Sequence, residues 1–153
     1  MKNMFIDLVR SRRSRRQFPR ESLTPGEVSL LMEAGDRAPS SRNLRPVRLY
    51  PVSDVNLIRR LAGCKDGGTE ALESAVFAVI VAADPSVSDV WIEDCSIATA
   101  FMQMEAEDLG IGSCWIQVRL RSLDGEPAED IVKRDAGIDP SYKVLSMVAF
   151  GRE

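Results

Sequence analysis

The chain has 153 residues, of which 44% are hydrophobic and 28% are charged, and its formal net charge is −3. These values predict one globular domain over residues 1–153 and exclude a disordered tail or a multi-domain enzyme. No apolar run reaches the ~18 residues that a membrane span needs, and no apolar block precedes a cleavage site near the N-terminus. We therefore expect a cytoplasmic protein without membrane contact.

The charge is divided unevenly along the chain. Residues 1–60 carry 13 basic and 6 acidic residues, a net charge of +7, whereas the remainder carries 7 and 17, a net charge of −10. Arginine supplies 16 of the 20 basic residues. Because the planar guanidinium group pairs well with phosphate and carboxylate, the first third is expected to meet an anionic partner. Composition alone does not distinguish a nucleotide from a nucleic acid.

The chain contains no histidine and three cysteines, Cys64, Cys95 and Cys114, without C-x-x-C spacing. The absence of histidine excludes Ser-His-Asp and Cys-His catalysis and any histidine-liganded metal site. The odd number of cysteines argues against a disulfide framework. We expect the three cysteines to be small buried hydrophobic residues in a reducing compartment. An enzyme of this composition is expected to take its reactivity from a cofactor, so we assign no metal ligand and no catalytic side chain.

The first half of the chain predicts two helices, a strand and a third helix. A short amphipathic helix over residues 4–9 leads into an arginine-rich segment. Thr24-Pro25-Gly26-Glu27 then predicts a capping box with proline in the first helical position. Residues 47–52 predict a strand, and Ser53-Asp54 predicts the cap of a helix over residues 55–62.

The second half predicts three strands and two helices. Residues 75–83 are continuously apolar and predict a strand covered on both faces. The longest helix is predicted from residue 88 to 109, followed by a strand over 113–118, a polar helix over 126–135 and a strand over 142–150. Helices interleaved with a few buried strands predict a sheet between layers of helices.

The longest predicted helix is apolar on two faces. A helix of this kind is surrounded by other structure. We expect a homodimer contact to bury the second face, and the alternative is a second covering helix of the same chain. The first stripe contains Trp91, Cys95, Ala98, Met102, Ala106 and Leu109, and the second contains Ile97, Phe101 and Met104.

Three segments could carry chemistry. Residues 10–16 place five arginines in seven positions, so guanidinium groups and the Ser14 hydroxyl could hold a phosphate. A solvated basic face and a nucleic-acid or targeting patch remain alternatives. In residues 38–46, Asn43 could bind the amide-like edge of a heterocycle, although the composition is also that of an ordinary turn. In residues 109–117, glycines would let the backbone approach a ligand, or would simply cap a helix before a core strand.

Together and in this order, the three segments resemble the flavin-dependent nitroreductase family. The resemblance implies an α+β fold, a nitroreductase-like three-layer sandwich with a central mixed β-sheet flanked by helices. It also implies a homodimer with one FMN in each of two sites at the subunit interface. The residues that carry it are Arg12-Arg13-Ser14-x-Arg16-x-Phe18, Ala38-Pro39-Ser40-Ser41-x-Asn43-x-x-Pro46, Leu109-Gly110-Ile111-Gly112-Ser113-Cys114-Trp115-Ile116 and Tyr142-x-Val144-x-x-Met147-Val148-Ala149-x-Gly151.

The resemblance further implies roles for individual residues. One group would hold the FMN phosphate and ribityl chain, a second would line the flavin from the other subunit, and the backbone of a third would lie near the flavin N5. Asn43 would bind the pyrimidine edge. The first group is Arg12, Arg13, Ser14 and Arg16, the second is Pro39, Ser40 and Ser41, and the third is Ile116 and Gln117.

The function that the resemblance implies is an NAD(P)H-dependent flavin oxidoreductase. Hydride would pass from NAD(P)H through the bound FMN to a small electron-poor acceptor, such as a nitroaromatic, a quinone or an activated alkene. The alternative is a non-catalytic flavin-binding protein that serves storage, sensing or regulation. An arginine-rich nucleic-acid-binding module ranks below both.

The chain departs from the family pattern at three places. Arg45-Pro46-Val47 stands where the family often has Gln-Pro-Trp, so contacts to the pyrimidine are expected to differ. The connection from Asp84 to Trp91 is short, which predicts an open substrate site. The sequence ends at Gly151-Arg152-Glu153, and the N-terminal arginines are expected to replace a basic phosphate ligand of the family's C-terminal extension.

Overall fold

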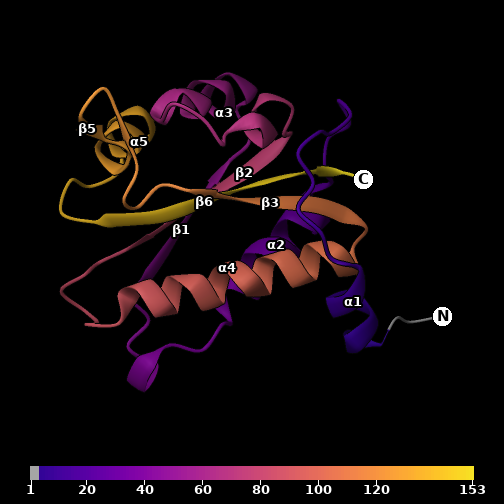
Figure 1. The fold of residues 1–153 in the computed structure, drawn as a ribbon. Coiled ribbons are helices and arrows are strands. Elements are labelled where there is room, and N and C mark those ends of the chain that lie inside the picture. Colours follow the sequence, from indigo (N-terminus) through magenta and orange to yellow (C-terminus); the bar gives the residue numbers. More distant parts are fainter. Residues whose placement is uncertain (1–3) are drawn as a thin grey trace.

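The computed structural model describes residues 4–153, in which a four-stranded sheet lies between two layers of helices (Figure 1). Single turns of 3₁₀-helix at Ser41–Asn43, Ala62–Cys64 and Glu70–Glu73 lie in the connections. The helices are α1 (Phe5–Ser11), α2 (Pro25–Asp36), α3 (Val55–Leu61), α4 (Trp91–Asp108) and α5 (Ala128–Ala136). The strands are β1 (Val47–Val52), β2 (Phe77–Ala83), β3 (Ile111–Gln117), β4 (Ser122–Leu123), β5 (Glu126–Pro127) and β6 (Lys143–Arg152).

The central sheet has the strand order β1-β2-β6-β3, and each of these neighbouring strands pairs antiparallel. An isolated parallel bridge between Ser14 and Ser113 attaches the N-terminal segment to the outer edge of β3, beside strands that pair antiparallel. Every residue of β2 is buried, as the apolar run predicted. The three-layer α+β sandwich expected from the resemblance is confirmed.

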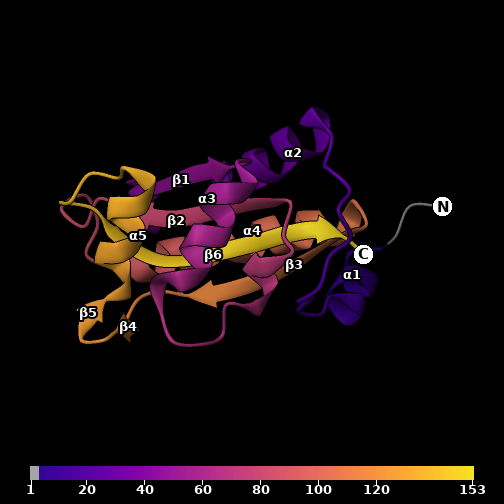
Figure 2. The same cartoon turned by 90° about the horizontal axis from the view of Figure 1, so that it is seen from above.

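The two faces of the sheet support separate halves of the core (Figures 1 and 2). On one face, α3 and α5 cover the strands, and Ile58, Ile80 and Val132 are fully or almost fully buried there. On the other face, α4 and α2 cover the strands, and Leu31 and Met102 are fully buried. Alternate residues of each strand belong to the two halves of the core, because successive side chains point to opposite faces of a sheet.

Local signals in the sequence define several element boundaries. Thr24 and Glu27 form the predicted capping box: the Thr24 hydroxyl accepts from the Glu27 N–H at 3.1 Å, and the Glu27 carboxylate accepts from the Thr24 N–H at 2.8 Å. The Asp54 carboxylate accepts from the Asn56 N–H at the start of α3. Gly110 ends α4 with a φ of +70°, the left-handed conformation that glycine adopts without strain.

Some boundaries differ from the prediction. Helix α4 begins at Trp91, because the Ser88 side chain bonds to Asp94 and does not cap the first turn. Strand β3 begins at Ile111 and α5 at Ala128, and the short hairpin of β4 and β5 before α5 was not predicted. Among residues 4–153, no helix is both long and apolar enough to span a bilayer.

Candidate functional site

Residues 12–18, which we call the arginine strap, are held against the outer edge of β3 mainly by their backbone. The Arg15 N–H donates to the Ser113 carbonyl at 2.9 Å, and the Phe18 N–H donates to the Ser74 hydroxyl at 3.0 Å. The buried Phe18 ring lies directly over Gly151, where a Cβ would come within 2.5 Å of the Phe18 side chain. The strap is therefore fixed without using its arginine side chains.

The four arginines of the strap, which we call the arginine cluster, have few carboxylate partners. In the part of the chain that the structure describes, no carboxylate lies within 4.0 Å of Arg12, Arg13 or Arg16, whereas Arg15 lies 3.7 Å from Glu153. The Ser14 side chain is also exposed. Like charges at this spacing repel one another, and a dianionic group would relieve that repulsion. In the single chain the cluster is exposed at the surface.

Two charged residues of the loop at residues 65–70 act on the electrostatics of Cys114 in β3. Burial raises the pKa of the Cys114 thiol, and the positive charge of Arg16 opposes that increase. Glu70 and Lys65 also act on this thiol through their charges, and burial lowers the pKa of Lys65. Lys65 and Glu70 therefore contribute to the electrostatic environment of Cys114 in β3. The sequence showed only a Lys-Asp-Gly-Gly turn at residues 65–68, and an electrostatic effect between residues this far apart in the chain leaves no local signal.

The outer edge of β3 presents main-chain groups next to the strap. The Ser113 carbonyl accepts from Arg15, so the alternation of an antiparallel strand turns the N–H and C=O of Trp115 and Gln117 toward the same open edge. The main chain of Ile116 instead faces β6, and its side chain lies in the α3–α5 half of the core. Of the two predicted residues, Gln117 therefore offers a free N–H and Ile116 contributes packing.

Side-chain hydrogen bonds hold the end of β3 in one conformation. The Trp115 indole N–H donates to the Gln117 side-chain oxygen at 2.9 Å, and the Gln117 side-chain nitrogen donates to the Arg119 carbonyl at 2.8 Å. The Gln117 amide is thus engaged at both ends, which leaves the backbone as the group available to a ligand.

Residues 38–46, which we call the serine loop, lie at the start of α4. The Ser41 N–H donates to one oxygen of Asp94 at 2.9 Å, and the Ser88 hydroxyl donates to the other oxygen at the same distance. Asp94 is buried, and its bond with Ser41 fixes the loop to the first turn of α4, while its bond with Ser88 holds the connection that precedes the helix. Ser40 accepts the Arg45 N–H at 3.0 Å.

The backbone of the serine loop is strained. Arg42, Asn43 and Arg45 have φ values of +51°, +55° and +55°, in the left-handed region that side chains other than glycine rarely adopt. This conformation costs about 1–2 kcal/mol per ordinary residue and less for asparagine. Strain of this kind concentrates at functional sites, where the surrounding structure holds it in place.

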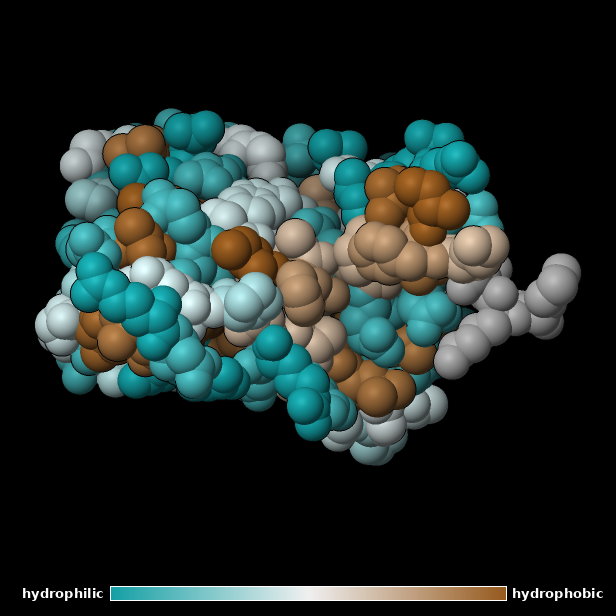
Figure 3. All heavy atoms as spheres, turned by 90° about the horizontal axis from the view of Figure 1, so that it is seen from below, coloured by the Kyte–Doolittle hydropathy of each residue, from teal (hydrophilic) through white to brown (hydrophobic). Residues whose placement is uncertain are grey.

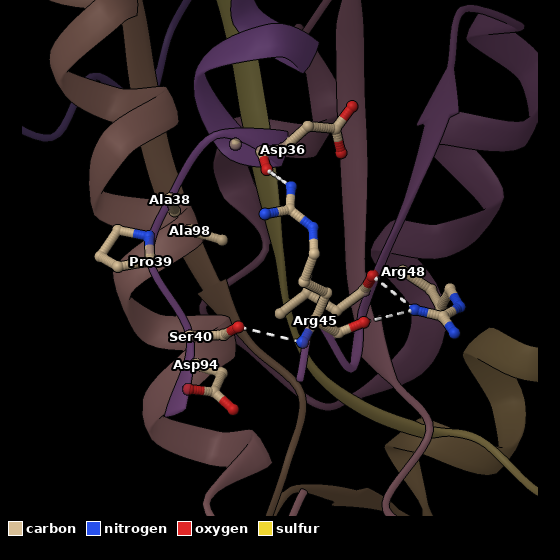
Figure 4. A pocket seen from close by; sticks show the side chains of 10 residues that line it. Asp36, Ala38, Pro39, Ser40, Arg45, Arg48, Asp94 and Ala98 are labelled. Atoms are coloured by element: carbon tan, nitrogen blue, oxygen red, sulfur yellow. Dashed lines mark hydrogen bonds between the residues drawn. The ribbon is translucent and has the colours of Figure 1, made fainter. Parts of the chain in front are cut away.

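A cavity of about 340 Å³ lies behind the serine loop (Figure 4). Its wall combines residues of α2, the loop, β1 and α4, and its polar groups carry both signs of charge. The charged and hydroxyl residues that line it are Asp36, Ser40, Arg45, Arg48 and Asp94.

The strap and the serine loop lie at opposite ends of α4. The Ser11 hydroxyl, just before the strap, donates to Glu107 in the last turn of α4 at 2.7 Å, whereas Ser41 bonds to Asp94 in its first turn. At 1.5 Å per residue, these two attachment points are about 20 Å apart along the helix. The structure thus divides the predicted site residues of a single chain into two groups.

The profile of the nitroreductase family matches residues 9–78 and 65–152 of the chain. The chain belongs to the nitroreductase family. A protein from Archaeoglobus fulgidus named as an NADH dehydrogenase/NAD(P)H nitroreductase is 29% identical over 150 residues, which cover 95% of this chain and 83% of that protein.

Solved structures of the family share this fold closely. The chain is 33% identical to an FMN-dependent nitroreductase from Clostridium difficile, with a TM-score of 0.94 and coverage of 97% of this chain and 87% of that one. A nitroreductase from Desulfovibrio desulfuricans described in complex with FMN has a TM-score of 0.82 at 22% identity and covers 99% of this chain and 87% of its own, so it supports the fold alone. The ligand roles of the predicted residues stay predictions.

Proposed function

We propose that this nitroreductase binds FMN at a site shared by two copies of the chain and works as an NAD(P)H-dependent flavin oxidoreductase. The observation that carries the proposal is the uncompensated arginine cluster beside an open strand edge that offers backbone N–H groups. The names of the two similar proteins, one FMN-dependent and one an NAD(P)H nitroreductase, support the same conclusion.

The residues of this chain fit the chemistry of FMN. Arg12, Arg13 and Arg16 have no carboxylate partner among residues 4–153, and together with the Ser14 hydroxyl they form a donor set suited to a dianionic phosphate. The N–H of Gln117 faces the open edge and could donate to a ring nitrogen.

The division of the site along α4 supports a homodimer. In a two-fold arrangement whose axis is perpendicular to α4, the α4 helices of two copies run antiparallel, so the strap end of one chain lies next to the serine-loop end of the other. Each pair of ends would then form one complete site, with Pro39, Ser40, Ser41 and Asn43 facing the flavin from the partner. A two-fold dimer would contain two such sites.

The exposed face of α4 between these ends suits a second copy. Ile97 and Phe101 are 39% and 44% exposed, so no helix among the described residues covers them, and Phe5 of α1 is 67% exposed nearby. Figure 3, which views the molecule from the side of α4, shows hydrophobic side chains gathered on this face. A groove of about 520 Å³ between α1, α2 and α4 is lined by Phe5, Leu8, Phe101 and Met104 among others. An exposed apolar helix face beside such a groove is the surface of this chain on which we place the second copy.

The chain's residues would bind and position, because bound FMN itself supplies the hydride chemistry by accepting and donating two electrons. The strap arginines would anchor the phosphate, and the Gln117 N–H would orient the ring at its reacting edge. The short connection from Asp84 to Trp91 leaves the serine-loop end without a covering helix, which favours planar acceptors of varied size, such as nitroaromatics, quinones and activated alkenes. The lack of histidine is compatible with hydride transfer, which needs no side-chain base.

An absorption spectrum of the purified protein, recorded before and after FMN is added, tests the binding step. We expect a yellow protein or one that takes up FMN, and loss of the flavin absorption when NADPH or NADH is added without oxygen. Steady oxidation of the nucleotide in the presence of an acceptor establishes an enzyme. Flavin uptake without turnover would identify a non-catalytic flavin protein, and a colourless protein that takes up no FMN would contradict the proposal.

A further inference from the structure

The guanidinium group of Arg45 joins Asn43 of the serine loop to the last residue of α2. One nitrogen donates to the Asn43 side-chain oxygen at 3.3 Å. The other terminal nitrogen donates to the Asp36 carbonyl at the end of α2 (Figure 4). The last carbonyls of a helix lack internal partners and carry partial negative charge, so a cation is favoured at this point.

The bond to Arg45 determines which half of the Asn43 amide remains available. An asparagine side chain has one carbonyl oxygen that accepts and one NH₂ group that donates. Because Arg45 has no acceptor, it can engage only the Asn43 oxygen. The bond occupies one of the two lone pairs of this oxygen and fixes the orientation of the amide, and the NH₂ group is the donor that remains for a ligand. Asn43 itself is exposed and has a φ of +55°.

The other two arginines of this region do not share the contact. The structure shows Arg48 donating to the carbonyls of Arg45 and Val47 and to no side chain. Arg42 is exposed in the same loop, has a similar positive φ, and makes no side-chain hydrogen bond among residues 4–153. Arg42 is thus a matched control for Arg45, because it has the same charge and a similar backbone strain but no bond to Asn43.

We propose that Arg45 is a positioning residue that makes Asn43 a hydrogen-bond donor to a carbonyl oxygen of the flavin pyrimidine ring. The proposal rests on the proposed function. It adds that Asn43 is the donor in this contact and that Arg45 is the residue that orients it. A free Asn43 amide could rotate and offer its oxygen to the flavin ring N–H instead. Arg45 removes that alternative and lowers the entropy lost when the ligand binds.

A double-mutant cycle measured by FMN titration tests this role. Arg45→Met should weaken FMN binding about 3- to 10-fold, the range that one neutral hydrogen bond contributes, whereas Arg42→Met should change it by less than about 2-fold. In an Asn43→Ala background, Arg45→Met should have no further effect on affinity. An equal loss in that background would mean that Arg45 acts through the general structure of the loop, and would overturn the proposal.

Asn43→Asp separates the donor role of Asn43 from its hydrogen bond with Arg45. The carboxylate still accepts from Arg45, so the thermal unfolding midpoint should not fall, but the side chain has no donor and FMN binding should weaken at least as much as in Asn43→Ala. An Asn43→Asp variant that binds FMN like the wild type would overturn the proposal while leaving the proposed function intact. A wild-type protein that takes up no FMN would overturn both.

Discussion

The arginine strap and the serine loop are held in place by opposite means. The strap is fixed through its main chain and through Phe18, so Arg12, Arg13 and Arg16 remain free to meet a ligand. The serine loop has a strained main chain, and the side chains of Asp94 and Ser40 hold it. Changes at the strap side chains should therefore affect binding but not stability, whereas changes at the anchors of the loop should affect stability first.

The largest expected effect comes from separating the two ends that build one site. Phe101→Glu places a carboxylate in the centre of the apolar α4 face, where burial of an unpaired charge is costly. We expect a monomer in analytical ultracentrifugation and FMN binding weakened more than about 100-fold, since each site loses its serine loop.

Leu120→Glu is the matched control for this change. Leu120 is 75% exposed and lies after β3, away from the α4 face, so the same substitution should leave both the dimer and FMN binding unchanged. A Phe101→Glu monomer that binds FMN at wild-type affinity would show that one chain contains the complete site.

Neutralising strap arginines should produce the next largest effect. Arg13→Gln and Arg16→Gln each remove a charge-assisted contact to phosphate, and we expect FMN binding to weaken about 10- to 100-fold. Binding of riboflavin, which lacks the phosphate, should change little, and so should the unfolding midpoint, because neither residue has an ion-pair partner among residues 4–153. Arg20→Gln, an exposed arginine beyond the strap, is the control. Equal losses for FMN and riboflavin would contradict a phosphate role.

The anchor of the serine loop should show the reverse pattern. Asp94→Ala leaves the Ser41 N–H and the buried Ser88 hydroxyl without their acceptor, and we expect a loss of about 2–3 kcal/mol in the free energy of unfolding. FMN affinity should fall by only a few fold, because no strap contact changes. Urea denaturation followed by circular dichroism measures the loss.

Asp89→Ala provides the comparison for Asp94→Ala. Asp89 is exposed just before α4 and makes no side-chain hydrogen bond in the part of the chain that the structure describes, so its removal should be nearly neutral. If Asp94→Ala were as stable as Asp89→Ala, the buried carboxylate would not be the anchor of the loop.

The contrast between strap and loop also explains what the sequence could predict. The Thr24–Glu27 capping box, the buried run of β2 and the two stripes of α4 are local patterns, and each predicted its element. The arginine spacing likewise identified the strap. The hydrogen bond from Ser41 to Asp94 joins residues 53 positions apart, and no local pattern predicts it.

The smallest expected effect is the pH dependence of the stability that the pair of Glu27 and Arg152 contributes. Arg152 at the end of β6 donates to Glu27 and to the Ser22 carbonyl, which ties the chain after the strap to the last strand. The hydrogen bond from Arg152 lowers the pKa of Glu27 from 4.5 to about 2. A carboxyl group with a lowered folded-state pKa stabilises the fold fully above its unfolded value and loses that contribution as it becomes protonated.

The Glu27 contribution should therefore be constant from neutral pH down to about 5 and disappear between about pH 4.5 and pH 2. Glu27→Gln should be less stable than wild type at pH 7, and the difference should close over that interval in urea denaturation curves. Glu126→Gln, which removes an exposed pair with Arg134, should show a much smaller difference at every pH, because solvent screens that pair. A stability deficit of Glu27→Gln that stays constant down to pH 2 would mean that packing at Arg152, and not the charge of Glu27, holds the segment after the strap to β6.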